Sequence, residues 1–112
     1  MNDSAVSTGN LGEKIFEGAK TNLAGHFSAI KKYLKGESEK LAITLRMILE
    51  GAASGEISED EARILINGQK VASSAVITAA QGMSAVAAQA ALNAGLAVVK
   101  EFVNGKIGFA LL

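Results

Sequence analysis

Apolar residues recur at helical spacing along the first half of the chain. One row contains Phe16, Leu23 and Ile30, and a second row contains Phe27, Leu34, Leu41 and Ile48. Such spacing places the rows on one face of a helix. The pattern therefore predicts one long helix from Leu11 to Ala53. A break at Gly36 is the alternative, because glycine is a poor helix former and Ser38 is suited to cap a new helix.

A turn interrupts the helical pattern at residues 51–61. Gly55 is suited to the left-handed conformation that ends many helices. Ser58 and Glu61 have the spacing of a capping box, in which each side chain binds the backbone N–H of the other residue. Glu59 and Asp60 place negative charge at the positive end of the next helix dipole. These residues predict that a second helix begins immediately after Ser58.

The second helical pattern extends from Glu59 to Asn104, with a kink expected at Asn67 and Gly68, a pair typical of turns. Proline is absent, so no residue of this kind interrupts a long helix. The predicted fold class is all-α, an elongated helical hairpin of two long helices whose second helix is rich in Ala and Gly. We expect residues 11–112 to form a single helical domain and residues 1–10 to form a flexible lead-in without the features of a signal peptide.

The segment between Lys70 and Lys100 contains no charged residue. A helix that is apolar around most of its circumference is typically surrounded by protein or by lipid. Small residues stand four positions apart in this segment, a spacing that lets helix backbones approach closely. We therefore predict a helix-association face. Its members are Val76, Ala80, Ser84, Val86, Ala87, Ala88, Ala91 and Gly95.

Composition narrows the classes of function. The 11 basic and 11 acidic residues give a net charge of zero, so the chain lacks the basic excess typical of nucleic-acid binding. Cysteine is absent, and the only histidine, His26, has no carboxylate at ligand spacing. The acidic residues Glu56, Glu59, Asp60 and Glu61 lack the pattern of a calcium loop. We therefore expect no enzymatic activity, no cofactor, no metal site and no small-molecule substrate.

Three hypotheses of function agree with these features. In the leading hypothesis, a non-enzymatic protein forms a homo-oligomer through its uncharged helix, as a filament, tube or channel component of bacterial or phage type. In the first alternative, it is a membrane-inserting, pore-forming or holin-like protein, because the segment is long enough for about 30 Å of hydrocarbon. In the second, it is a small helical adaptor that binds a partner helix. The predicted partners are thus copies of the same chain or, alternatively, a lipid bilayer.

Overall fold

The computed structural model describes residues 5–23, 25, 27–81 and 83–112, with only the backbone of Gln81. Within these residues the fold is all-helical, as the sequence predicts, and contains no strand. A short 3-10 turn, η1 (Thr8–Asn10), precedes four α-helices in the described part of the chain. They are α1 (Leu11–Lys20), α2 (Phe27–Ser54), α3 (Glu59–Gln81) and α4 (Ala85–Ile107). The predicted hairpin of two long helices is therefore wrong, because each predicted arm consists of two helices.

The first predicted arm divides between Lys20 and Phe27, and not at Gly36. Gly36 lies exposed inside α2, and no neighbouring atom lies within 4 Å of the position that a Cβ would take. Glycine at this position costs about 1 kcal/mol relative to alanine. Burial of the Leu34 and Leu41 side chains on the same helix offsets that cost. The helix therefore continues through Gly36.

The connection between α1 and α2 contains Thr21, Asn22 and Gly25, which are all weak helix formers. The Thr21 hydroxyl donates a hydrogen bond of 2.8 Å to the carbonyl oxygen of Gly18 in α1. The Asn22 amide donates a hydrogen bond of 3.3 Å to the carbonyl oxygen of Ala90 in α4. Thr21 therefore satisfies a carbonyl group at the end of α1, and Asn22 joins the connection to α4.

The second predicted arm divides at residues 82–84, of which Gly82 lies outside the described residues. Ser84 caps α4, because its Oγ accepts a 3.1 Å hydrogen bond from the backbone N–H of Ala87. In contrast, α3 continues as an α-helix through Asn67 and Gly68, where the sequence suggested a kink. In this chain, the capping residue Ser84 therefore marks the start of a new helix, whereas the Asn67-Gly68 pair does not interrupt a helix.

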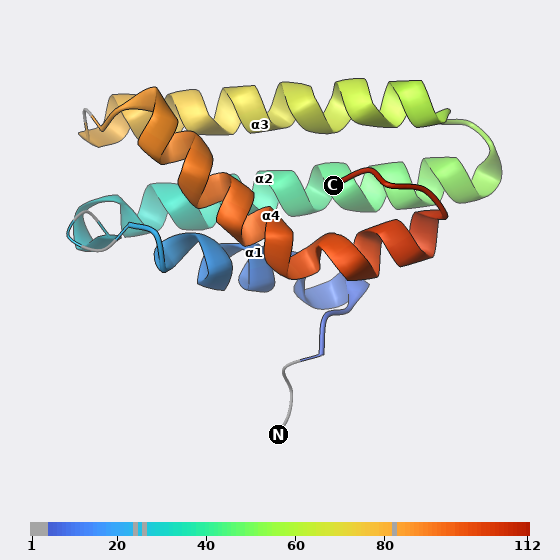
Figure 1. The fold of residues 1–112 in the computed structure, drawn as a ribbon, viewed down its shortest axis with the longest axis horizontal. Coiled ribbons are helices and arrows are strands. Elements are labelled where there is room, and N and C mark those ends of the chain that lie inside the picture. The colour runs from blue at the N-terminus through green and yellow to red at the C-terminus, as the bar shows by residue number, and fades with distance from the viewer. Residues whose placement is uncertain (1–4, 24, 26, 82) are drawn as a thin grey trace.

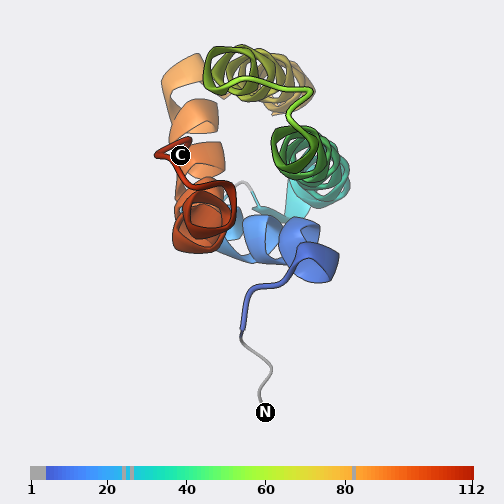
Figure 2. The same ribbon diagram turned by 90° about the vertical axis from the view of Figure 1, so that its right-hand side faces the viewer.

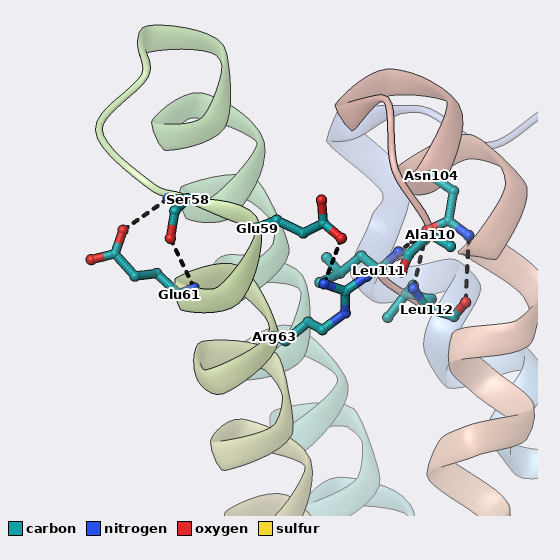
Figure 3. A network of polar contacts seen from close by, with 8 residues as sticks. All are labelled: Ser58, Glu59, Glu61, Arg63, Asn104, Ala110, Leu111 and Leu112. Atoms are coloured by element: carbon teal, nitrogen blue, oxygen red, sulfur yellow. Dashed lines mark hydrogen bonds and ion pairs between the residues drawn. The ribbon is translucent and has the colours of Figure 1, made fainter.

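The turn between α2 and α3 has the expected geometry. Gly55 adopts a φ of 81°, in the left-handed region, and two backbone N–H groups beyond it donate to the carbonyl oxygen of Gly51. The backbone N–H of Ser58 donates to Glu61 Oε1 at 2.8 Å, and the backbone N–H of Glu61 donates to Ser58 Oγ at 3.1 Å (Figure 3). Both hydrogen bonds of the capping box therefore form at the start of α3.

Figure 1 shows α2 and α3 as long antiparallel neighbours, with α4 crossing diagonally from the end of α3 towards α1. The view along the long axis shows the four described helices around a common centre (Figure 2). Large apolar side chains from every helix are fully buried there. They include Leu11, Ile15, Ile30, Leu34, Leu41, Leu45, Ile48, Ile66, Ile77, Leu92 and Val99.

Helices α1 and α4 cross at a pair of glycines. A Cβ at Gly95 would overlap the carbonyl oxygen of Ile15, and a Cβ at Gly18 would lie only 2.9 Å from the Cα of Gly95. Larger residues at either position would push the two helices apart. The small residues of α4 therefore serve a close helix contact within the same chain.

Candidate assembly surface

The predicted helix-association face does not form one surface, because the break at residues 82–84 divides it between α3 and α4. Val76 and Ala80 are half-buried on α3, and Ser84 is exposed in the connection. On α4, Ala87 is half-buried and Val86 is 77% exposed. Only part of the predicted face is therefore free to contact another molecule.

The remaining predicted residues, Ala88, Ala91 and Gly95, are buried in the core of the chain itself. Gly95 lies against Ile15 of α1. This part of the prediction is corrected, because a row of small residues indicates a close helix neighbour without indicating whether that neighbour belongs to the same chain.

An uncharged surface that the sequence analysis missed lies on the outer side of α3. It consists of the exposed residues in the range 64–79, to which we refer as the α3 face, and only Asn67 among them has a polar side chain. They are Ile64, Leu65, Asn67, Gly68, Val71, Ala72, Ala75 and Ala79. Ile64 is 71% exposed and Val71 is 66% exposed. The available signal was the spacing of Ile64, Gly68, Val71 and Ala75 at intervals of four, three and four, which is typical of a helix-packing seam.

The exposed side of α4 is also uncharged until Lys100. Most of its residues are small or apolar, and two are neutral amides. They are Ala85, Val86, Gln89, Ala90, Asn93, Ala97 and Val98. A helix side of this composition costs little to remove from water, because it carries no charge that would lose hydration.

A groove of about 250 Å³ between α3 and α4 links the two surfaces. Its lining includes Asn67 and Val71 from the α3 face, Gln89 and Asn93 from α4, and the side chain of Lys70. These side chains offer hydrogen-bonding amides and one ammonium group. None of the described lining residues is a carboxylate or an imidazole that would act as a general base.

Charged side chains gather on the other helices. Ion pairs on α1 and α2 join Lys14 to Glu17, Lys40 to Glu37 and Arg46 to Glu39. At the start of α3, Glu59, Asp60 and Glu61 form an acidic group in the first turn. Hydrogen bonds from the backbone and side chain of Ser58 hold the pKa of Glu61 below its ordinary value of 4.5. The described surface is therefore charged on α1, α2 and the first turn of α3, and neutral along most of α3 and α4.

The C-terminal segment folds back between α3 and α4 (Figure 3). Arg63 of α3 donates a 2.9 Å hydrogen bond to the carbonyl oxygen of Ala110, and its guanidinium lies 5.7 Å from the ring centre of Phe109. Arg63 also forms an ion pair of 2.6 Å with Glu59. The side chain of Asn104 accepts hydrogen bonds from the N–H groups of residues 111 and 112. The apolar tail is thus fixed against α3 and α4 of the same chain.

One helix of the described chain is long and apolar enough to cross a membrane. This helix, α4, has a mean hydropathy of 1.3 in its most apolar window, of which 39% is buried inside the protein. Core helices of soluble proteins share this length and composition. The hydropathy of α4 is therefore weak evidence for a membrane span.

Among the described residues, no three His, Cys, Asp or Glu side chains gather to hold a metal ion, and His26 lies outside the described residues. Comparisons with known protein families, with curated protein sequences and with solved structures find no match. The uncharged surface of α3 and α4 is therefore the feature of the described structure that points to a function.

Proposed function

We propose that this protein is a non-enzymatic helical self-assembly protein, whose copies associate by burying the uncharged surface of α3 and α4. The observation that carries the proposal is the exposure of Ile64, Val71 and Val86 on a surface whose exposed residues carry no charge. Contiguous exposed apolar surface is typical of sites where a protein binds other molecules. Such contacts would repeat between neighbouring copies in a filament, a tube or a channel.

Hydrophobic burial supplies the driving force in this proposal. Full burial of a Val or Ile side chain contributes roughly 1.5–3 kcal/mol. Ala72, Ala75 and Gly68 leave room for a neighbouring backbone to approach, and close approach increases dispersion contacts. The charged residues of α1 and α2 stay in water when copies associate through α3 and α4. The distribution of charge therefore favours one orientation of the protomers.

Lysine substitutions on the neutral surface test the proposal. Val71→Lys and Val86→Lys each place an ammonium group where an interface would remove it from water, so we expect association to weaken at least about tenfold. Both positions are exposed in the protomer, so circular dichroism and thermal melts should remain close to those of the parent. Sedimentation velocity over a range of concentrations measures the association.

Ile43→Lys is the matched control, because Ile43 is an exposed apolar residue on α2, 57% accessible and outside the neutral surface. It should associate as the parent does. If Val71→Lys and Val86→Lys both associate like the parent while remaining folded, the neutral surface is not the assembly surface. A parent protein that stays monomeric at all concentrations would reject self-assembly itself.

Insertion into membranes is a second candidate function, favoured by the length and hydropathy of α4. A pore-forming or holin-like protein would use α3 and α4 in lipid, with the amides of Gln89 and Asn93 facing other copies. Leakage of dye from phosphatidylcholine and phosphatidylglycerol vesicles distinguishes the two functions. Self-assembly predicts large particles in plain buffer without leakage, whereas insertion predicts leakage that Val86→Lys abolishes.

A further inference from the structure

The α3 face has an ordered sequence of large and small residues. Along the seam, Ile64 is followed by Gly68, Val71 and Ala75, so large and small side chains alternate. Ile64 and Val71 are mostly exposed, and no neighbouring atom lies within 4 Å of the Cβ position at Gly68. The face therefore presents two protruding side chains and two depressions of the kind that receive side chains from another helix.

We infer that two copies of the protein pair through the α3 face in antiparallel orientation, with Ile64 of each copy against Ala75 of the other and Val71 against Gly68. This inference rests on the proposed self-assembly and specifies how one contact is made. Each layer of the antiparallel pair joins one large residue to one small residue, as dense helix packing requires. One surface thus supplies both halves of the interface, which is the property of a two-fold contact.

The positions of the charges select the antiparallel pair over the parallel one. Glu59, Asp60 and Glu61 lie in the first turn of α3, whereas the last turns of the helix carry no charge. A parallel pair would bring the acidic groups of both copies together, and it would place Ile64 against Ile64 and Gly68 against Gly68. The antiparallel pair instead places each acidic turn beside the uncharged end of the other helix. It also sets the two helix dipoles antiparallel, which is the favourable arrangement for neighbouring helices, whereas a parallel pair would align them.

The same features favour a second copy over an unrelated partner. A different helix would need an uncharged seam with the same spacing and the reverse order of large and small residues. The α3 face meets both requirements when it is turned by a two-fold rotation. Gly68 lies near the centre of that pair, where the two backbones must approach most closely.

Disulfide mapping tests the pairing, because the natural chain contains no cysteine. In the antiparallel pair, residue 64 of one copy lies level with residue 75 of the other, while the two residues 64 lie about 16 Å apart along the axis. Disulfides require Cα atoms within about 7 Å. The double variant Ile64→Cys/Ala75→Cys should therefore cross-link into a dimer under mild oxidation, whereas Ile64→Cys alone should not.

The control is Ile43→Cys/Ala75→Cys, which moves one exposed cysteine from α3 to α2. We expect at least about tenfold less cross-linked dimer from it and from either single variant. Trypsin cleaves after Arg63, Lys70 and Lys100, so mass spectrometry can identify a bond between the peptides that contain positions 64 and 75. Circular dichroism of the reduced variants verifies that the fold is retained.

The outcomes separate this inference from the proposed function. Efficient cross-linking of Ile64→Cys alone would show a parallel pair and overturn the inference. If the parent associates in sedimentation experiments but no bond between positions 64 and 75 forms, antiparallel pairing is also overturned while self-assembly stands. If the parent is monomeric at every concentration, both proposals fail.

Discussion

The effect of a glycine on the stability of this fold differs from one position to another. Gly55 adopts a positive φ at the end of α2, which residues with a side chain rarely do. Gly95 lets α4 approach the backbone of α1. Gly36 does neither, because it lies in a regular helix with open space around it. The same amino acid therefore stabilises the fold at two positions and weakens it at the third.

Alanine substitutions should have opposite effects at Gly95 and Gly36. We expect Gly95→Ala to lower the free energy of unfolding by about 1–3 kcal/mol, because its methyl group overlaps the Ile15 carbonyl. We expect Gly36→Ala to raise it by roughly 0.5–1 kcal/mol through helix propensity. Urea denaturation followed by circular dichroism measures both changes. A Gly95→Ala variant as stable as the parent would contradict the close crossing of α1 and α4.

Protonation of Glu61 should weaken the start of α3. Because hydrogen bonds to Ser58 lower the pKa of Glu61 in the folded protein, its carboxylate stabilises the fold above the ordinary value of 4.5. That contribution is lost as the pH falls through the lowered pKa. Glu61→Gln keeps an acceptor but cannot titrate, so the stability advantage of the parent over this variant should shrink between pH 6 and pH 3. Urea midpoints across that range measure it, and a constant difference would exclude a stabilising carboxylate.

At the scale of elements, the strongest local signals predicted the structure well. Gly55, Ser58 and Glu61 indicate the turn between α2 and α3 because capping depends on residues within one turn of each other. The break between α1 and α2 was not predicted, because Thr21 and Asn22 resemble ordinary helix residues until their partners are known. One of those partners is Ala90, which lies far away in the sequence.

The sequence indicated that the candidate surface is uncharged, but it did not indicate which exposed residues of α3 and α4 form that surface. The absence of charge between Lys70 and Lys100 indicated a helix segment suited to burial; within it Ala88, Ala91 and Gly95 are buried in the core, whereas Val86 is exposed. Periodicity could not show that α1 would cover these residues, since that depends on the break at residues 21–26. The α3 face was missed because it begins before Lys70, outside the uncharged segment.

Asn104 makes three of the hydrogen bonds that hold the C-terminal segment, and Arg63 makes another. Asn104 Oδ1 accepts hydrogen bonds of 2.9 and 3.0 Å from the N–H groups of Leu111 and Leu112. Asn104→Ala removes the oxygen that accepts both hydrogen bonds, so we expect faster amide exchange at these two residues and a loss of about 1 kcal/mol in stability. Hydrogen exchange measured by NMR checks the prediction. Asn93→Ala, at an exposed amide on the same helix, is the control and should leave exchange in the tail unchanged.

At the scale of the whole molecule, charge divides the protein into two sides. Ion pairs cover α1 and α2, whereas exposed residues of α3 beyond its first turn and of α4 before Lys100 carry no charge in the described structure. Exposed ion pairs such as that between Arg46 and Glu39 contribute little to stability. Their effect is instead to keep one side of the protein hydrated. Association through the other side should then respond to solvent as hydrophobic burial does.

Salt and temperature therefore distinguish a neutral interface from a charged one. We expect sodium sulfate to strengthen association of the parent, because it strengthens apolar burial, and cooling to weaken association, because the hydrophobic effect is largely entropic near room temperature. Moderate sodium chloride should have little effect, since there are few charges to screen at the interface. Sedimentation velocity in each solvent measures the change, and Val71→Lys should show a smaller response to sulfate. Association that sodium chloride abolishes and temperature leaves unchanged would place the interface on the charged side, against α1 and α2.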